Sequence, residues 1–175
     1  MRKVLHFLDL LDDIDTEWMA MRGSKCHVSA GTVLIQEGEE IDAIYFVLDG
    51  EFTVRAGAAN KEIATLLSGE IVGEMSFVDS RPPTASVVAG RDSQILRIPR
   101  ELLNEKLAKD QAFAARFYRG IATFLSDRLH VTVGRLGYGA AEQDRDPSEL
   151  DDQSIERISL AATRFDGMLR RLQTT

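Results

Sequence analysis

The chain has a single cysteine, Cys26, among its 175 residues, so it cannot form an internal disulfide. We expect this thiol to be buried or inert. Long apolar runs are also absent, because Asp9, Asp12 and Asp13 interrupt the apolar residues near the N-terminus. The sequence therefore predicts neither a membrane span nor a signal peptide, and the expected location is the cytoplasm, without membrane contact.

Basic residues are few relative to acidic ones. The 21 Lys and Arg residues stand against 28 Asp and Glu, which gives a net charge of -7. This balance argues against nucleic-acid binding, which needs a basic face. The three histidines, His6, His27 and His130, lack metal-ligand spacing, and no Ser-His-Asp order or P-loop is apparent. The sequence thus predicts no metal site and no enzyme.

What the chain does have is enough apolar sequence, 44% of its residues, for one domain with a core and some appended structure. In residues 26–96, short alternating apolar runs are separated by glycines, which is typical of a small antiparallel barrel or jelly roll. Asp49-Gly50 predicts a tight hairpin turn within this region, and residues 57–61 predict a second turn. Pro99 marks the end of the last strand, because proline cannot extend a central strand.

Helical patterns flank the barrel on both sides. Residues 1–23 predict a helical lead-in whose apolar side chains recur on shared faces: Leu5, Leu8, Leu11, Ile14, Trp18, Met19 and Met21. From Arg100 a first helix runs to a break near Lys109, and a longer helix follows. Its apolar stripe comprises Phe113, Phe117, Ile121, Phe124, Leu125, Leu129 and Val133. The stripe suits packing on the barrel and a homodimer interface equally, so both alternatives stay open.

Glycines from Gly134 onward end the long helix, and residues 142–152 form a polar, mostly acidic linker. The final segment regains a helical stripe of Ile155, Ile158, Ala162, Phe165 and Leu169. It could join a dimer interface, dock on the barrel or bind a partner protein. We divide the chain into a helical lead-in (1–25), a β-barrel (26–99), a helix pair (100–137), a linker (138–152) and a C-terminal amphipathic helix (153–175).

Residues 71–87 have the composition of an anion cradle. Gly73 lets the backbone pass close to a ligand, and the amides of Met75, Ser76 and Phe77 would be unpaired donors at the start of a short helix. An ionised Glu74 could accept a hydrogen bond from a sugar hydroxyl. A small phosphate-bearing ligand is therefore expected at this segment.

This segment resembles the phosphate-binding cassette of cyclic nucleotide-binding domains, the sensor modules of the catabolite activator protein, protein kinase A regulatory subunits and cyclic-nucleotide-gated channels. Residues 72–77, Val-Gly-Glu-Met-Ser-Phe, match its first half, and residues 84–87, Thr-Ala-Ser-Val, match its second half. The spaced glycines of the family are also present: Gly31, Gly38, Gly50, Gly69 and Gly73. The resemblance implies a mainly β fold with flanking helices, in which a jelly-roll barrel carries the cassette and long C-terminal helices follow it.

One residue departs from the family pattern. Pro83 occupies the position of the arginine that grips the cyclic phosphate, and the nearest arginine, Arg81, lies two residues earlier. Proline supplies neither the charge nor the paired donors of a guanidinium. Either Arg81 replaces it, or the amide turn alone holds the anion, or the fold serves another purpose. The expected result is weak, altered or lost binding of cyclic AMP or cyclic GMP.

The resemblance also implies which residues would line a ligand site: Gly73, Glu74, Met75, Ser76, Arg81, Thr84, Ala85 and Thr132. Thr132 lies near the position of a helix threonine that touches the base in bacterial regulators, although Val133 replaces the next polar contact. No cofactor is certain, and a cyclic nucleotide is the candidate ligand.

Two functions agree with these patterns. The first is a stand-alone regulatory or adaptor protein, in which a ligand rearranges helix against barrel. The alternative is the sensor part of a cyclic AMP-responsive transcriptional regulator of the Crp/Fnr type. Roughly 35 residues with a single helical pattern and an acidic bias follow the long helix, which is too little for a DNA-binding module. The sequence therefore favours the first function.

Overall fold

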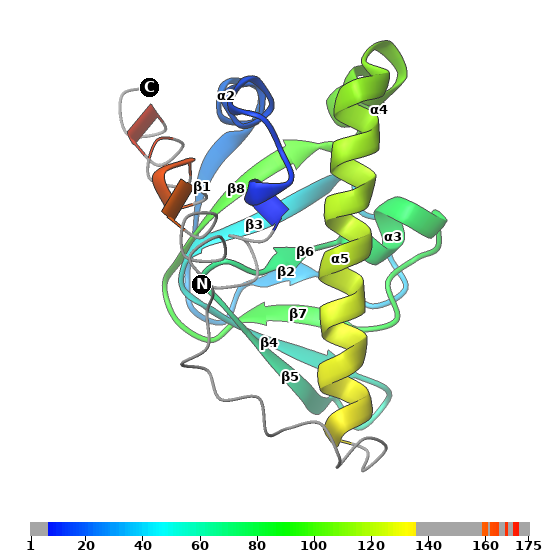
Figure 1. Cartoon of the computed structure of the whole chain (residues 1–175). Coiled ribbons are helices and arrows are strands. Elements are labelled where there is room, and N and C mark those ends of the chain that lie inside the picture. The colour runs from blue at the N-terminus through cyan, green and yellow to red at the C-terminus, as the bar shows by residue number, and fades with distance from the viewer. Residues whose placement is uncertain (1–6, 136–158, 161, 165–166, 168–169, 172–175) are drawn as a thin grey trace.

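The structure is a computed structural model of the chain, and it describes residues 7–135, 159–160, 162–164, 167 and 170–171. Within these residues, strands form two four-stranded antiparallel sheets that face each other as a flattened barrel (Figure 1). One sheet has the order β1-β8-β3-β6 and the other β2-β7-β4-β5. The strands are β1 (Ser24–Val28), β2 (Val33–Ile35), β3 (Ala43–Asp49), β4 (Glu51–Ala56), β5 (Lys61–Leu67), β6 (Ile71–Val72), β7 (Ser86–Ala89) and β8 (Ser93–Pro99). The mainly β jelly-roll fold predicted from the sequence is confirmed.

Strand β3 separates two hydrophobic clusters. Its side chains alternate between them, because successive residues of a strand point to opposite faces of the sheet. Ile44, Phe46 and Leu48 belong to a cluster shared with the helices, whereas Tyr45 and Val47 belong to the cluster inside the barrel. A strand that is covered on both faces is expected to be apolar along its length, as the sequence of β3 is.

The predicted hairpin turn at Asp49-Gly50 is wrong. Strands β3 and β4 lie in different sheets, so Gly50 marks a corner at which the chain crosses between sheets. Gly50 has a φ of 133°, and a Cβ atom there would lie 2.1 Å from Ser93 Oγ. Glycine is therefore needed at position 50 because Ser93 packs closely against it, and not because Asp49-Gly50 forms a two-residue turn. The predicted turn at residues 57–61 is confirmed, because β4 and β5 pair antiparallel across it.

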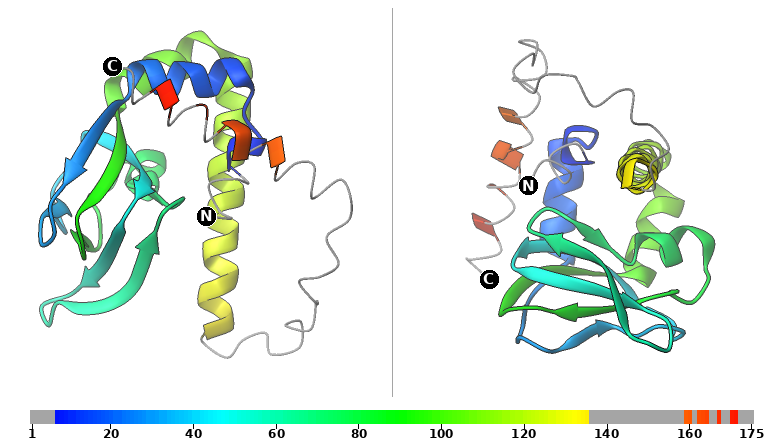
Figure 2. Two further views of the ribbon diagram at one scale, coloured as in Figure 1. Left: turned by 90° about the vertical axis from the view of Figure 1, so that its left-hand side faces the viewer. Right: turned by 90° about the horizontal axis from the view of Figure 1, so that it is seen from below.

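The barrel is flanked by the helices α2 (Asp13–Arg22), α3 (Glu74–Asp79), α4 (Arg100–Lys109) and α5 (Gln111–Arg135). Helices α2 and α4 lie across one end of the barrel, and α5 runs along its side next to α3 (Figure 2). No described helix combines the length and hydropathy that a bilayer crossing requires.

The sequence predicted one helix over residues 1–23, but the described part of this segment is interrupted before Asp13. The apolar faces predicted for a continuous helix are therefore wrong. Asp12 is the N-cap of α2, and Asp12 and Asp15 form a capping box that starts a new helix at Asp13. The change of register leaves Ile14 and Met21 exposed, at 73% and 66%, while Met19 is buried.

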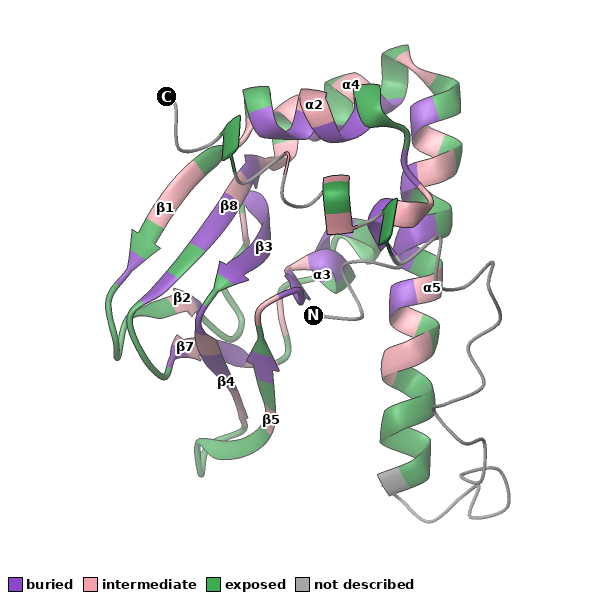
Figure 3. Ribbon diagram, turned by 60° about the vertical axis from the view of Figure 1, so that its left-hand side comes forward, coloured by how far each residue is buried: buried purple, intermediate pink, exposed green. Residues whose placement is uncertain are grey.

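The apolar stripe of α5 divides into two parts along the helix. Phe113, Phe117, Ile121 and Phe124 are buried against the barrel and the N-terminal segment. Beyond them Leu129 is 61% exposed, and the far end of the helix is solvent-accessible (Figure 3). Packing on the barrel is therefore confirmed for the first half of the stripe.

Described residues of the C-terminal segment lie against the N-terminal part of the chain. Arg164 Nε is 2.6 Å from Asp13 Oδ1, and Arg164 Nη1 donates to the Leu8 carbonyl at 3.1 Å. Ala162 packs against the helix-side cluster, and Arg171 pairs with Glu17. The other members of the predicted stripe, Ile155, Ile158, Phe165 and Leu169, lie outside the described residues.

Candidate functional site

A cavity of about 280 Å³ opens between the barrel, α3 and α5. Its walls come from β2, β4, β5, β6 and β7, from the cassette and from one residue of α5. The lining residues are Ile35, Val54, Leu66, Val72, Gly73, Glu74, Met75, Ser76, Asp79, Arg81, Pro82, Pro83, Thr84, Ala85, Val87 and Arg128. The structure thus brings together every site residue predicted from the sequence except Thr132.

Gly73 lies at the start of the cassette, between β6 and α3. It follows β6 directly, has a φ of 88° and is the N-cap of α3. A Cβ atom there would lie 2.8 Å from Ile41 Cδ1 and 3.2 Å from the Ala43 carbonyl oxygen, so a side chain would clash with a core residue and with backbone. The backbone torsion and the space both require glycine.

The sequence predicted that the amides of Met75, Ser76 and Phe77 would be unpaired donors, and this prediction is wrong for Phe77. The Phe77 amide donates to the Gly73 carbonyl at 3.0 Å, as the first hydrogen bond of α3. The helix has six residues, and its C-terminal end is held by Arg100. Arg100 Nη1 donates to the Ser76 carbonyl at 3.1 Å, and Arg100 Nη2 lies 2.8 Å from Ser80 Oγ. The cassette is therefore anchored from α4 on the side away from β6.

Glu74 is 2% exposed and forms an ion pair with Arg128 of α5, with 2.5 Å between Oε1 and Nη1. Arg128 Nη2 also lies 3.3 Å from Glu70 Oε2 and donates to the Ile71 carbonyl at 3.1 Å. The guanidinium carbon stands 4.7 Å from the centre of the Phe124 ring. Arg128 thus joins α5 to strand β6 and to the cassette through several interactions at once.

Burial is the main influence on the Glu74 carboxyl, and it raises the pKa above the ordinary value of 4.5. The positive charge of Arg128 acts in the opposite direction, and the neighbouring Glu70 adds to the increase of the pKa. The Arg128 guanidinium is therefore the group that favours the ionised form of the buried Glu74 carboxyl.

Sequence analysis did not identify Arg128, which lies 54 residues from Glu74. One weak signal was available: Arg128 precedes the predicted site residue Thr132 by one helical turn. Thr132 itself is exposed and does not line the cavity, and its hydroxyl donates to the Arg128 carbonyl at 2.8 Å. The structure thus shows Arg128, rather than Thr132, as the α5 residue that faces the cassette.

Pro83 lines the cavity, and its carbonyl accepts the Gly38 amide at 2.8 Å. This bond fixes the cassette loop to the β2–β3 connection. Arg81 lines the same cavity, but its side chain is 83% exposed, its amide donates to Asp79 Oδ1 at 3.0 Å and its Nε lies 4.0 Å from Asp79 Oδ2. Arg81 does not take the place of the missing arginine in this arrangement.

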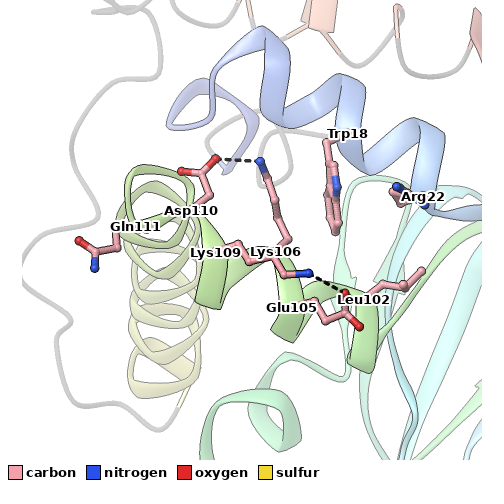
Figure 4. Close-up of a pocket in the computed structure, with 8 residues that line it drawn as sticks. All are labelled: Trp18, Arg22, Leu102, Glu105, Lys106, Lys109, Asp110 and Gln111. Carbon is pink, nitrogen blue, oxygen red and sulfur yellow. Dashed lines mark hydrogen bonds and ion pairs between the residues drawn. The ribbon is translucent and has the colours of Figure 1, made fainter.

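A second pocket, of about 560 Å³, lies between α2, α4 and the start of α5 (Figure 4). Four of its charged side chains form two ion pairs, with Lys106 Nζ 2.7 Å from Asp110 Oδ2 and Lys109 Nζ 3.3 Å from Glu105 Oε2. Lys106 also stands over the Trp18 ring, at 5.9 Å from its centre. These contacts explain the pocket as the junction of three helices. Among the described residues, no group of His, Cys, Asp and Glu is arranged to hold a metal ion, and Cys26 is half-buried on β1.

The described strands thus form a jelly roll with a glycine-led short helix at its cavity, and the long helix α5 contributes Arg128 to the lining of that cavity. Residues 25–110 match the family model described as cyclic nucleotide-binding domain. This part of the chain belongs to the cyclic nucleotide-binding domain family, and the resemblance found in the sequence is confirmed.

Solved structures share the fold. A cyclic nucleotide-binding domain from Methylobacillus flagellatus is similar with a TM-score of 0.69 at 22% identity, over 77% of this chain and 81% of that one. The catabolite activator protein of Thermus thermophilus is similar with a TM-score of 0.59 at 25% identity, over 73% of this chain and 59% of that one.

Among curated proteins, a lysophospholipase, nte1, of Aspergillus oryzae is 29% identical over 128 residues, which make up 71% of this chain. The chain spans 8% of the length of that relative. The matched part is therefore a small fraction of a much longer protein.

Proposed function

We propose that the chain is a regulatory or adaptor protein whose cyclic nucleotide-binding domain binds cyclic nucleotides weakly or not at all. The observation that carries this proposal is Pro83, which lines the cavity at the position where relatives place an arginine. Arg81 supports it, because this side chain extends into solvent beside Asp79. A phosphate in the cavity would lack the two-pronged charged contact that normally dominates its affinity.

The coupling between ligand and output would pass through Arg128. This residue holds α5 against Glu74 and the Ile71 carbonyl, so any ligand that moves the cassette also changes the contacts of α5. A ligand can shift the position of α5 only by the difference between its affinities for two arrangements of the cassette. Residues 26–99 would then be the sensor, and residues 100–137 would transmit its state.

Calorimetric titration with cyclic AMP, cyclic GMP and cyclic dinucleotides tests the proposal. We expect little or no binding heat with the natural chain. Pro83→Arg should create or greatly tighten cyclic nucleotide binding, because it restores the guanidinium while keeping the carbonyl that accepts the Gly38 amide. Pro82→Arg is the matched control, since it adds the same charge one residue away in the same cavity wall. Tight binding by the natural chain, or no gain from Pro83→Arg, would contradict the proposal.

A second candidate is the sensor part of a Crp/Fnr-type transcriptional regulator, and the similarity to the Thermus thermophilus catabolite activator protein favours it. That function requires a natural chain that binds cyclic AMP with an affinity useful to a sensor. The same titration therefore separates the two candidates.

We also propose that the chain forms a homodimer through the far half of α5. Leu129 and Val133 are 61% and 36% exposed, although they are the last two members of the apolar stripe predicted for the helix. An isolated apolar stripe at the end of a long helix is the kind of surface that a second copy can cover symmetrically.

A further inference from the structure

The inner wall of the cavity is continuous with the barrel core. Ile35, Leu66, Val72 and Val87 line the cavity and are also members of the hydrophobic cluster inside the barrel, with exposures of 3–6%. Val54 packs against the same cluster from the same side. A ligand that enters the cavity would therefore place most of its surface against aliphatic side chains.

The charged groups around the cavity balance one another. The cations among the described lining residues are Arg81 and Arg128, and each has a carboxylate within 4.0 Å. Glu70, Glu74 and Asp79 supply three carboxyl groups against these two guanidinium groups. The summed charge of these five groups does not become positive even when Glu74 is protonated. An anion would enter a site without an excess of positive charge, and it would have to compete with Glu74 for Arg128.

We propose that the natural ligand of this cavity is an uncharged, mainly apolar small molecule. The proposal rests on the proposed function, in which the domain keeps its sensor fold but loses strong phosphate binding. The aliphatic wall would hold the body of the ligand by removing it from water, and the hydroxyls of Ser76 and Thr84 at the cassette would orient it. Its size is limited, because a cavity of about 280 Å³ lies just below the usual range of ligand pockets, which is roughly 300–1,000 Å³.

A fluorescent probe of this chemical class provides the test. N-phenyl-1-naphthylamine is uncharged and apolar, and its emission rises when it leaves water. We expect a saturable increase with one equivalent of the full chain. An excess of cyclic AMP should not displace the probe, because each cation among the described lining residues already has a carboxylate within 4.0 Å.

Two tryptophan substitutions locate the probe. Ala85→Trp places a large ring at the cavity wall and should weaken probe binding by about tenfold or more. Ala58→Trp puts the same ring in the exposed β4–β5 turn and should change the affinity by less than about twofold. Circular dichroism and thermal unfolding establish that both variants are folded, and Val54→Trp provides a second cavity-filling variant should Ala85→Trp not fold.

The outcomes separate this proposal from the proposed function. Absence of saturable probe binding, or equal binding by Ala85→Trp and Ala58→Trp, overturns the apolar-ligand proposal. If Pro83→Arg still gains cyclic AMP binding in that case, the proposed function stands. Displacement of the probe by low concentrations of cyclic AMP in the natural chain overturns both.

Discussion

At the scale of single residues, the ion pair of Glu74 and Arg128 is the contact on which the site depends most. Glu74 has a side-chain exposure of 3%, whereas that of Arg128 is 26%, so the carboxyl cannot exchange its partner for water while the guanidinium partly can. Removal of one member of a buried pair is costly because it leaves the other without compensation. The cost should therefore be unequal for the two partners.

Arg128→Ala should destabilise the chain by about 2–3 kcal/mol, because Glu74 and the Ile71 carbonyl lose their shared donor. Urea unfolding measures this free energy. The double variant Glu74→Gln/Arg128→Ala should lose less than the sum of the two single variants, since the buried carboxyl is gone. Arg128→Lys keeps the positive charge but not the paired donors of the guanidinium, so its stability should lie between that of the natural chain and that of Arg128→Ala. Additive losses would show that the pair is energetically unimportant.

The pH dependence of stability should report on Glu74. Burial raises the pKa of Glu74 in the folded chain above 4.5, so ionisation is harder in the folded state than in the unfolded state. The contribution of Glu74 to stability is therefore fully present below the unfolded pKa and is lost as the pH rises through the folded pKa. Relative to Glu74→Gln, the natural chain should become less stable with rising pH. Urea unfolding of both proteins across this range gives the difference, and an increase with pH would mean that Arg128 outweighs burial.

At the scale of elements, the position of α5 is fixed by aromatic packing along its first half. Phe117 is fully buried, and its ring centre lies 5.6 Å from that of Phe7, 5.9 Å from that of Phe77 and 5.6 Å from that of Phe113. This one side chain contacts the N-terminal segment, the cassette helix α3 and its own helix. Edge-to-face geometry with Phe7 adds to the area that it buries.

Phe117→Ala should cost about 3–5 kcal/mol, because it removes a ring from a close-packed cluster and leaves a cavity at the junction of three elements. Leu129→Ala on the same helix is the matched control and should stay within about 0.5 kcal/mol, since Leu129 is 61% exposed. Thermal and urea unfolding compare the two. Equal effects would show that α5 does not depend on its buried stripe.

At the scale of the whole molecule, the two ends of the described chain meet on one side of the barrel. Arg164 contacts Asp13 and the Leu8 carbonyl, and Asp15 of α2 pairs with Arg116 of α5 at 2.7 Å. The N-terminal helix therefore has the C-terminal segment on one face and α5 on another. Among the described residues, these contacts do not involve Leu129 and Val133 in the far half of α5, which are exposed and to which the dimer proposal refers.

Sedimentation velocity over a range of concentrations should show a dimer of the natural chain. Leu129→Glu should shift it to a monomer, because a charge would enter the apolar stripe between the copies. Ile14→Glu is the control, since Ile14 of α2 is also exposed, at 73%, but lies outside that stripe. A monomer at every concentration would rule out the dimer, and a dimer of Leu129→Glu would place the interface elsewhere.

The amino-acid sequence by itself determined the barrel, the cassette and the missing arginine. These depend on local signals: the short apolar runs of strands such as β3, the positive φ that Gly73 requires, and the difference between Pro83 and the arginine that the family resemblance implies. Such signals are present in a few neighbouring residues and need no knowledge of what packs against them.

Only the tertiary structure decided which of the predicted elements contact one another. Asp49-Gly50 has the composition of a hairpin, yet Ser93 packs so closely on Gly50 that the chain turns a corner between sheets. The partner of Glu74 comes from Arg128, 54 residues along the chain, and half of the α5 stripe is core while the other half is exposed. Long-range pairing and burial arise from the packing of whole elements in three dimensions, and residue spacing along the chain does not contain that information.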